Sequence, residues 1–286
     1  MIQDLFQAGG QTLSFEVSPP KTEEEFESAY AKLTQLAALS PDFFSVTYGA
    51  GGSRSRNTAQ IASYIQNTLR VPTLAHMTCV GSKKDDILQV VRELKEAGIH
   101  DVLALRGDRP AWMSEEQFLS RDFAHASDLT RFLKEHTDLH IAGACYPEKH
   151  YEAADMEQDI AHLREKVEAG AEFLITQLFF DNDFFYRFLE KVRAAGIDRP
   201  ICAGIMPITT AQQIGTTVHL SGSSVPKAFA DLVAVHADNK EDMRRAGTEY
   251  AIRQILDLKA HGVRHIHLYT MNRPRTTKEI VEAVRI

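Results

Sequence analysis

The stretch MEQDIAHLREKVEAGAEFLITQLF, residues 156–179, contains the pattern that decides the fold. Residues 156–169 have the apolar spacing of an amphipathic helix, and residues 173–179 form the apolar run of a buried strand. Between them stands Gly170, and glycine adopts the left-handed conformation that commonly closes a helix. The stretch therefore predicts a helix that ends at a glycine and leads into a strand.

The same helix–glycine–strand junction recurs at residues 96–99, 194–197 and 260–263. Helical spacing is also present at residues 23–39, 84–97 and 241–261. Strands are predicted at residues 13–18, 43–48, 73–79, 102–106, 141–146, 173–179, 201–206 and 266–270. Eight strands alternating with helices predict a (β/α)₈ TIM barrel, of the α/β class, as a single catalytic domain over residues 1–286. The alternative is a doubly wound sheet, but its G-x-G-x-x-G fingerprint is absent after the first strand.

The composition is that of a globular protein. The 286 residues include 32 Lys+Arg and 39 Asp+Glu, a net charge of −7, which argues against a nucleic-acid partner. A run of about 18 apolar residues, as a spanning helix requires, is absent, so we expect no membrane partner. The N-terminus lacks a basic segment followed by an apolar one, and the simplest expectation is a cytoplasmic protein without a secretory signal. Cys79, Cys145 and Cys202 are too scattered for a disulfide framework or a zinc site, and each is expected to be a small buried residue.

Polar residues follow nearly every predicted strand, where the active site of a barrel lies. The strand ends read SFEVSPP (14–20), SVTYGAGG (45–52), AHMTC (75–79), LRGD (105–108), CYPE (145–148), ITQLFFD (175–181), GIMP (204–207) and YTMNR (269–273). The connection over residues 107–126 is long for a barrel and contains the only tryptophan, Trp112, so it is a candidate lid.

Glu16 is the most informative of these residues. It alternates with Phe15 and Val17, so if those two pack outward, its carboxyl points into the barrel mouth. A partly desolvated carboxyl can stay protonated near neutral pH, which suits a general acid. An inward glutamate paired with a neighbouring Arg or Lys is an equally good interpretation of the residue taken alone.

Other strand-end residues also have two interpretations. Asp108 either caps the next helix or turn, or places a negative charge beside a reacting heterocycle. Asp159 and Lys166, two helical turns apart, either bind ribose hydroxyls and pyrophosphate or belong to a solvated face. Residues 49–52 either cradle a phosphate or form a tight turn.

The strand histidines raise the question of a metal site. His76 follows an apolar run, where a hydrogen-bonded core histidine is the usual outcome, and His265 and His267 share one strand face. No third ligand is indicated beside them, so we expect no metal site.

Taken in order, the strand ends resemble the methylenetetrahydrofolate reductase family, in its short form with only the catalytic barrel. The resemblance runs from Ser14 to Arg273, and the segment after the eighth strand is too short for the C-terminal regulatory domain of eukaryotic relatives. The motifs are F-E-x-x-P-P, V-T-Y-G-A, H-x-T-C, L-R-G-D, Y-P-E-x-H, T-Q-x-F-F-D, G-I-x-P and Y-T-x-N-R.

This resemblance implies an enzyme that binds FAD and reduces 5,10-methylenetetrahydrofolate to 5-methyltetrahydrofolate, which supplies methyl groups for methionine synthesis. NADH or NADPH would reduce the flavin first and leave before the folate binds. The implied catalytic residues are Glu16 as general acid and Asp108 as the carboxylate near flavin and pterin. Folate contacts are implied for Gln177 and Gln213, and pairing with the glutamate carboxylate of folate for Arg273. The resemblance also implies a homo-oligomer.

The positions that the resemblance assigns to FAD come from most of the strand ends and from one helix. They are Thr47, His76, Arg106, Gly107, Asp108, His125, Ala126, Ala144, Tyr146, His150, Asp159 and Lys166. Two positions depart from the pattern of some relatives: His125 replaces a tyrosine against the flavin, and Thr217 replaces a phenylalanine or leucine that touches the stacked substrate. Without an apolar side chain at Thr217, substrate binding would be weaker by roughly 1–3 kcal/mol.

Two other functions stay open at this point. A flavin-free barrel could bind a pterin for methyl or one-carbon transfer. A barrel could also serve as a binding or scaffold protein, although so many polar residues at one rim disfavour that alternative.

Overall fold

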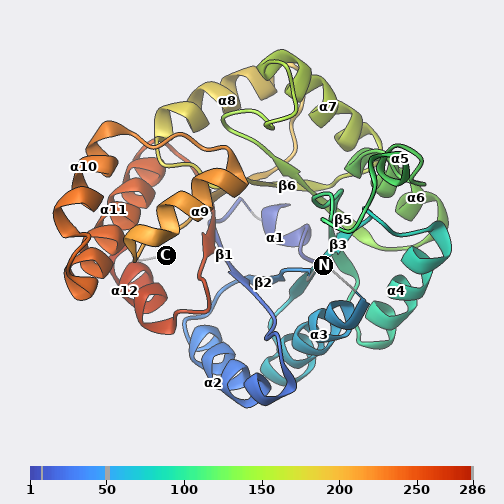
Figure 1. Cartoon of the computed structure of the whole chain (residues 1–286), viewed down its shortest axis with the longest axis horizontal. Helices are drawn as coiled ribbons and strands as arrows, with labels where there is room; N and C mark the ends of the chain where they lie inside the picture. Colours follow the sequence, from blue (N-terminus) through green and yellow to red (C-terminus); the bar gives the residue numbers. More distant parts are fainter. Residues whose placement is uncertain (8, 49–51, 285–286) are drawn as a thin grey trace.

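The structure, a computed structural model, describes residues 1–7, 9–48 and 52–284. Its centre is a closed barrel of parallel strands in the order β1 to β8, with β8 paired to β1 (Figure 1). The strands are β1 (Thr12–Val17), β2 (Phe43–Val46), β3 (Thr73–Thr78), β4 (Asp101–Leu105), β5 (His140–Cys145), β6 (Phe173–Thr176), β7 (Ile201–Ile205) and β8 (His265–Tyr269). The predicted TIM barrel is confirmed.

Helices surround the barrel in chain order, as Figure 1 shows. They are α1 (Asp4–Gln7), α2 (Phe26–Ala37), α3 (Gly52–Ser63), α4 (Lys84–Glu96), α5 (Glu115–Leu119), α6 (Ala126–His136), α7 (Met156–Glu168), α8 (Asn182–Ala194), α9 (Ala211–Ser221), α10 (Lys227–His236), α11 (Lys240–Ala260) and α12 (Pro274–Val284). A short 3₁₀ turn (Glu23–Glu25) precedes α2, and a π-helix (Tyr64–Leu69) follows α3.

All eight predicted strands are present, with ends that differ by up to three residues. The largest difference is at β6, predicted to reach residue 179 but ending at Thr176. Beyond that point the side-chain oxygen of Gln177 accepts the N–H of Leu178, so this N–H is not used for pairing with a neighbouring strand. The sequence is still apolar there, which is why the predicted strand is too long. The predicted glycine stops are confirmed, because the glycines at these junctions have positive φ angles: Gly98, Gly170, Gly196 and Gly262.

Two apolar layers fill the fold. An outer layer, which includes Phe15 and Val17, lies between the strands and the helices. A smaller inner layer fills the barrel around Phe43, Leu103 and Phe173. The alternation that sends Phe15 and Val17 outward turns Glu16 into the barrel.

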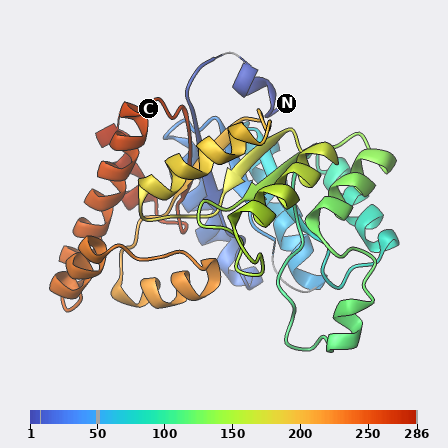
Figure 2. The ribbon, with the colours of Figure 1, turned by 90° about the horizontal axis from the view of Figure 1, so that it is seen from above.

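The N-terminal segment closes the end of the barrel opposite the strand ends. Ile2 is fully buried, and the Phe6 ring lies 4.8 Å from the Phe173 ring, centroid to centroid. In Figure 2, α1 lies at one end of the barrel, and α5 and α9 lie at the other. The functional groups at the strand ends therefore face the mouth that α1 leaves open.

Gly247 allows a close contact between one outer helix, α11, and the loop that follows β7. A Cβ atom on Gly247, in α11, would lie 1.7 Å from the carbonyl oxygen of Ile208, in the loop between β7 and α9. Only a residue without a side chain permits this approach of backbone to backbone. The loop before α9 therefore rests directly on α11.

The remaining sequence expectations about structure have mixed outcomes. The three cysteines are free and buried, as predicted. The long connection after β4 contains α5 and an exposed Trp112, and its movement as a lid stays a prediction. Residues 49–51 of the predicted phosphate cradle lie outside the described residues. Within the described ranges, the helices are too short or too polar to cross a membrane.

Candidate active site

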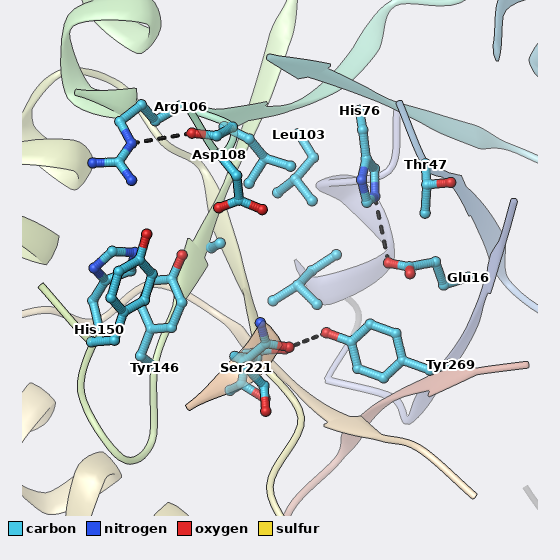
Figure 3. Close-up of a pocket in the computed structure, with 17 residues that line it drawn as sticks. Glu16, Thr47, His76, Leu103, Arg106, Asp108, Tyr146, His150, Ser221 and Tyr269 are labelled. Atoms are coloured by element: carbon cyan, nitrogen blue, oxygen red, sulfur yellow. Dashed lines mark hydrogen bonds and ion pairs between the residues drawn. The ribbon is translucent and has the colours of Figure 1, made fainter. Parts of the chain in front are cut away.

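A central cavity of about 300 Å³ lies at the C-terminal ends of the strands (Figure 3). Nearly all strands contribute a side chain or the residue that follows them. The sequence-predicted residues that line this cavity are Glu16, Thr47, His76, Arg106, Gly107, Asp108, Ala144, Tyr146, His150 and Gln177. Residues up to 253 positions apart in the chain, Glu16 and Tyr269, thus meet at one rim.

Three further cavities share lining residues with the central one, and two of these are also lined by other sequence-predicted site residues. The first, the α7 cavity, has about 390 Å³, shares Arg106, Tyr146 and His150 with the central cavity, and lies beside α7. Its other sequence-predicted lining residues are His125, Ala126, Asp159 and Lys166. The structure therefore extends the site from the barrel axis toward α7, in the direction that the resemblance implies for FAD.

The second, the α9 cavity, has about 450 Å³ and shares Glu16 and Gln177 with the central cavity. Gln213 and Thr217 line it from α9. The Arg273 guanidinium reaches this end, where its Nη1 donates to Oε1 of Gln213 at 3.4 Å. Arg273 has no carboxylate within ion-pair distance in the described part of the chain, and burial lowers its pKa.

Glu16 lies between two histidines at the border of the central and α9 cavities. Its Oε2 is 3.6 Å from Nε2 of His76, on β3, and 3.6 Å from Nε2 of His267, on β8. Among the described residues, no Lys or Arg lies within ion-pair distance of Glu16, so the predicted alternative of a pairing with either is wrong. The carboxyl group instead points into the cavity with imidazoles as its charged or polar neighbours (Figure 3).

His76 is the hydrogen-bonded strand histidine that the sequence predicts. Its Nε2 lies 2.6 Å from the Ser45 hydroxyl, and the residue is 7% exposed. Burial lowers the pKa of the imidazole, and the nearby Glu16 carboxyl opposes part of that effect. A neutral ring is therefore favoured beside Glu16.

Asp108 faces Glu16 across the central cavity (Figure 3). It does not cap the next helix, because α5 is capped by Ser114, whose hydroxyl accepts the N–H of Gln117 at 3.1 Å, and the other part of that alternative, a turn cap, stays a prediction. Gly107 has a φ of +83°, and a Cβ there would lie 2.8 Å from a Val80 methyl carbon. Glycine at this position therefore lets the chain turn so that Asp108 enters the cavity.

Lys166 and Asp159 both line the α7 cavity, so the alternative of a solvated charged face is wrong. The Lys166 ammonium donates to the carbonyl oxygen of Ala144, and among the described residues it has no carboxylate within ion-pair distance. Desolvation lowers the pKa of Lys166 and raises that of Asp159. The ammonium thus keeps donors available for an anionic ligand.

Arg106 differs from Lys166 because it already has a partner. Its guanidinium donates to both carboxylate oxygens of Glu152, at 2.5 and 2.9 Å, and this pairing lowers the pKa of Glu152 to about 2. His125 stacks on His162 at the outer end of the α7 cavity, with ring centroids 6.1 Å apart.

Sequence reasoning missed the role of several residues at the site. Tyr269 lines both the central and the α9 cavities, and its hydroxyl donates to the carbonyl oxygen of Thr176 at 2.7 Å. The hydroxyls of Ser45 and Ser14 are hydrogen-bonded to His76 and His267, respectively. The alternation of each strand already places these side chains inward with Thr47, Glu16 and His267, a signal that could have identified them.

The chain is similar in sequence to known proteins along nearly its whole length. The family model described as "Methylenetetrahydrofolate reductase" matches residues 1–285. The chain is 32% identical to "5,10-methylenetetrahydrofolate reductase" of Escherichia coli, over 99% of this chain and 94% of that protein. It is also 36% identical to "Methylenetetrahydrofolate reductase 1" of Schizosaccharomyces pombe, over 95% of this chain and 45% of that protein. The chain thus spans about half the length of the yeast relative, and 48% of a similar protein of Arabidopsis thaliana.

Solved structures are similar in fold. A protein from Clostridium thermocellum, described as binding two copies of 5-methyl-5,6,7,8-tetrahydrofolic acid, aligns with a TM-score of 0.69 at 15% identity, over 99% of this chain and 97% of that one. A dihydropteroate synthase from Xanthomonas albilineans aligns with a TM-score of 0.52 at 16% identity, over 96% of this chain and 93% of that one.

Proposed function

Because this chain belongs to the methylenetetrahydrofolate reductase family, we propose that it reduces 5,10-methylenetetrahydrofolate to 5-methyltetrahydrofolate with a bound FAD and a reduced nicotinamide nucleotide. The observation that carries the proposal is the placement of Glu16 and Asp108 on opposite sides of one strand-end cavity that continues toward Lys166. The folate-binding protein of similar fold from Clostridium thermocellum is consistent with a pterin substrate.

The residues of the central and α7 cavities fit FAD. A flavin ring is planar with a polar edge, and the central cavity combines apolar residues such as Leu103 with amide and carboxyl groups. Lys166, with unused donors, suits a phosphate, and Asp159 suits ribose hydroxyls. When bound there, FAD would supply the hydride transfer that amino-acid side chains cannot perform.

Glu16 would supply the proton. The O–H bond of its carboxyl breaks as a nitrogen of the methylene bridge takes the proton, and the C–N bond to that nitrogen breaks with its electron pair. The carbon left behind is an electrophilic iminium that can accept a hydride. Glu16 sits where the central and α9 cavities meet, so it can reach a substrate that spans both.

The other residues would bind and orient the folate. Asp108 would place its carboxyl group near the pterin, and the Gln177 and Gln213 amides offer hydrogen bonds from the central and α9 cavities. The buried Nε2 of Gln213 has no hydrogen-bond partner among the described residues, so it has a donor free for substrate.

An absorption spectrum tests the proposed function. We expect purified protein to be yellow, to bleach anaerobically with NADH or NADPH, and to regain its colour when 5,10-methylenetetrahydrofolate is added. Comparing the bleaching rates with the two nucleotides identifies the electron donor. Colourless protein that binds folate would favour the flavin-free barrel, and protein that binds neither ligand would favour the scaffold.

Alanine in place of Arg273 is expected to weaken folate binding and to spare the chemical step. A guanidinium binds both oxygens of a carboxylate, and a charge-assisted hydrogen bond contributes about 1.5–3 kcal/mol, so the KM for folate should rise roughly 10- to 150-fold with little change in kcat. Steady-state kinetics measure the KM and kcat. Lys in place of Arg273 should recover part of the affinity, because it keeps the positive charge but cannot bind both carboxylate oxygens as a guanidinium does.

Arg275 is the matched control for Arg273. It is exposed and pairs with Glu241 and Glu279 on the outer helices, so its alanine variant should keep the parent KM. Equal effects of the two substitutions on KM would contradict the role of Arg273.

The assembly and location belong to the same proposal. We expect one catalytic domain over residues 1–286 and a homo-oligomer in the cytoplasm, as the family resemblance implies. Light scattering during gel filtration gives the mass of the assembly, and a mass equal to one chain would contradict the oligomer.

A further inference from the structure

A second histidine contacts Glu16 from the side opposite His76. Ser14 and His267 are paired in the register of β1 and β8, directly beneath Glu16 and Tyr269, which are also paired. Ser14 and His267 are both completely buried, and the Ser14 hydroxyl lies 2.7 Å from Nδ1 of His267. The side chains of Ser14, His267 and Glu16 are therefore successive polar neighbours inside the barrel.

The other ring nitrogen of His267 lacks a partner. Its Nε2 is buried without a hydrogen bond among the described residues, and Oε2 of Glu16 lies 3.6 Å away, within ion-pair distance but slightly beyond hydrogen-bond distance. A buried polar atom left unpaired destabilises the folded state. Aromatic rings fix the imidazole, with Phe43 stacked at 6.5 Å and Tyr269 edge-on at 5.1 Å between centroids. The fold thus holds His267 rigidly with one nitrogen aimed at Glu16.

The Ser14 hydroxyl has two possible acceptors, Nδ1 of His267 at 2.7 Å and the carbonyl oxygen of Ile266 at 3.4 Å. The shorter of the two contacts is the one to Nδ1. When the hydroxyl donates to Nδ1, a neutral imidazole has its proton on Nε2, the nitrogen that faces Glu16.

We propose that His267, oriented by Ser14, is a positioning residue that presents its Nε2–H to Glu16 and stabilises the carboxylate left when Glu16 gives its proton to the folate. The inference rests on the proposed function and adds a residue to it. In this step the Glu16 O–H bond breaks and its electron pair stays on the carboxylate, while His267 neither gains nor loses a proton. A donor aimed in advance at the charge that develops lowers the barrier.

His76 does not duplicate this role. Its Nε2 also lies 3.6 Å from Oε2 of Glu16, but it is engaged by Ser45 at 2.6 Å, so it is less available to the carboxylate. The titratable groups that face Glu16 are His76 from β3, His267 and Tyr269 from β8, and Asp108 across the cavity. The hydroxyl of Tyr269 is committed to the Thr176 carbonyl.

Two amide variants separate the role of each ring nitrogen. In His267→Asn the amide stands near the position of Nδ1 and keeps a partner for Ser14, but nothing reaches Glu16. In His267→Gln the amide reaches the position of Nε2 and offers an N–H to Glu16. We expect the Asn variant to lower the rate of folate reduction by prereduced holoenzyme 10- to 100-fold, and the Gln variant to stay within about threefold of the parent.

The pH profile and the other half-reaction distinguish this role from a structural one. Loss of a donor to the carboxylate makes proton release from Glu16 less favourable, so the pH profile of folate reduction in His267→Asn should differ from that of the parent, whereas His267→Gln should keep the parent profile. The rate of flavin reduction by the nicotinamide nucleotide should be unchanged in both. Equal profiles in all three proteins, or an equal loss in the two half-reactions, would overturn the proposal.

A spectroscopic measurement tests the contact without turnover. In the holoenzyme labelled with ¹⁵N-histidine, the signals absent from His267→Asn belong to His267, and we expect them to show a neutral ring protonated on Nε2. Protonation on Nδ1 would overturn the proposal even in an active enzyme. A parent that shows the expected ring but does not reduce folate would overturn the proposed function itself, and with it the role of His267.

Discussion

Glutamine in place of Glu16 is expected to eliminate folate reduction and to leave flavin reduction by the nicotinamide nucleotide intact. The amide has the shape of the protonated carboxyl but cannot release a proton to the methylene bridge. General acid catalysis contributes roughly 10²–10⁴-fold, and the rate of the folate half-reaction should fall by that factor. The measurement is rapid mixing of prereduced enzyme with 5,10-methylenetetrahydrofolate, followed by flavin absorbance.

The two half-reactions provide the internal control for this variant. Flavin reduction needs no proton from Glu16, so its rate should match that of the parent. Glu27→Gln, an exposed position on α2, should preserve both rates and shows the effect of losing one surface charge. Full folate reduction by Glu16→Gln would refute the role of Glu16 as the acid.

Methionine in place of Lys166 is expected to release FAD. Met keeps most of the side-chain length, which matters because the Lys166 stem packs over Gly143, where a Cβ would lie only 2.7 Å from its Cδ. The substitution removes the charge that would contact the phosphates. Truncation of one member of a buried charge pair costs about 2–5 kcal/mol, so the Kd for FAD should rise between roughly 30-fold and several thousand-fold.

Calorimetric titration of flavin-stripped protein with FAD measures this change. Lys191→Met, on the exposed surface of α8, removes the same charge away from the site and should keep the parent Kd. An unchanged Kd in Lys166→Met, together with a normal flavin content after purification, would contradict the assignment of the α7 cavity to FAD.

Local sequence patterns predicted the barrel because each strand, helix and helix end has a recognisable pattern within its own few residues. Apolar runs, helical spacing and the closing glycines such as Gly170 depend on neighbours within a few residues. The inward direction of Glu16 follows in the same way from its two apolar neighbours. The convergence of the strand ends then follows from the rule that parallel strands of a barrel present their C-terminal ends at one face.

The partners of Glu16 could not be predicted in this way. Ser14 and His267 are 253 positions apart, and their contact depends on the register in which β8 closes against β1. The alternation of side chains along a strand predicts that His267 points inward. It does not predict at which level of the barrel His267 meets Glu16. The same limit applies to Arg273 and Gln213, which are 60 positions apart and meet only because α9 folds over the mouth.

The contact of Gly247 with Ile208 ties the position of α11 to the α9 end of the site. Backbone rests on backbone there, so no side chain separates the helix from the loop that leads to Gln213. Any larger residue at position 247 would have to move α11 and this loop apart. The shape of the α9 cavity therefore depends on a residue that does not line it.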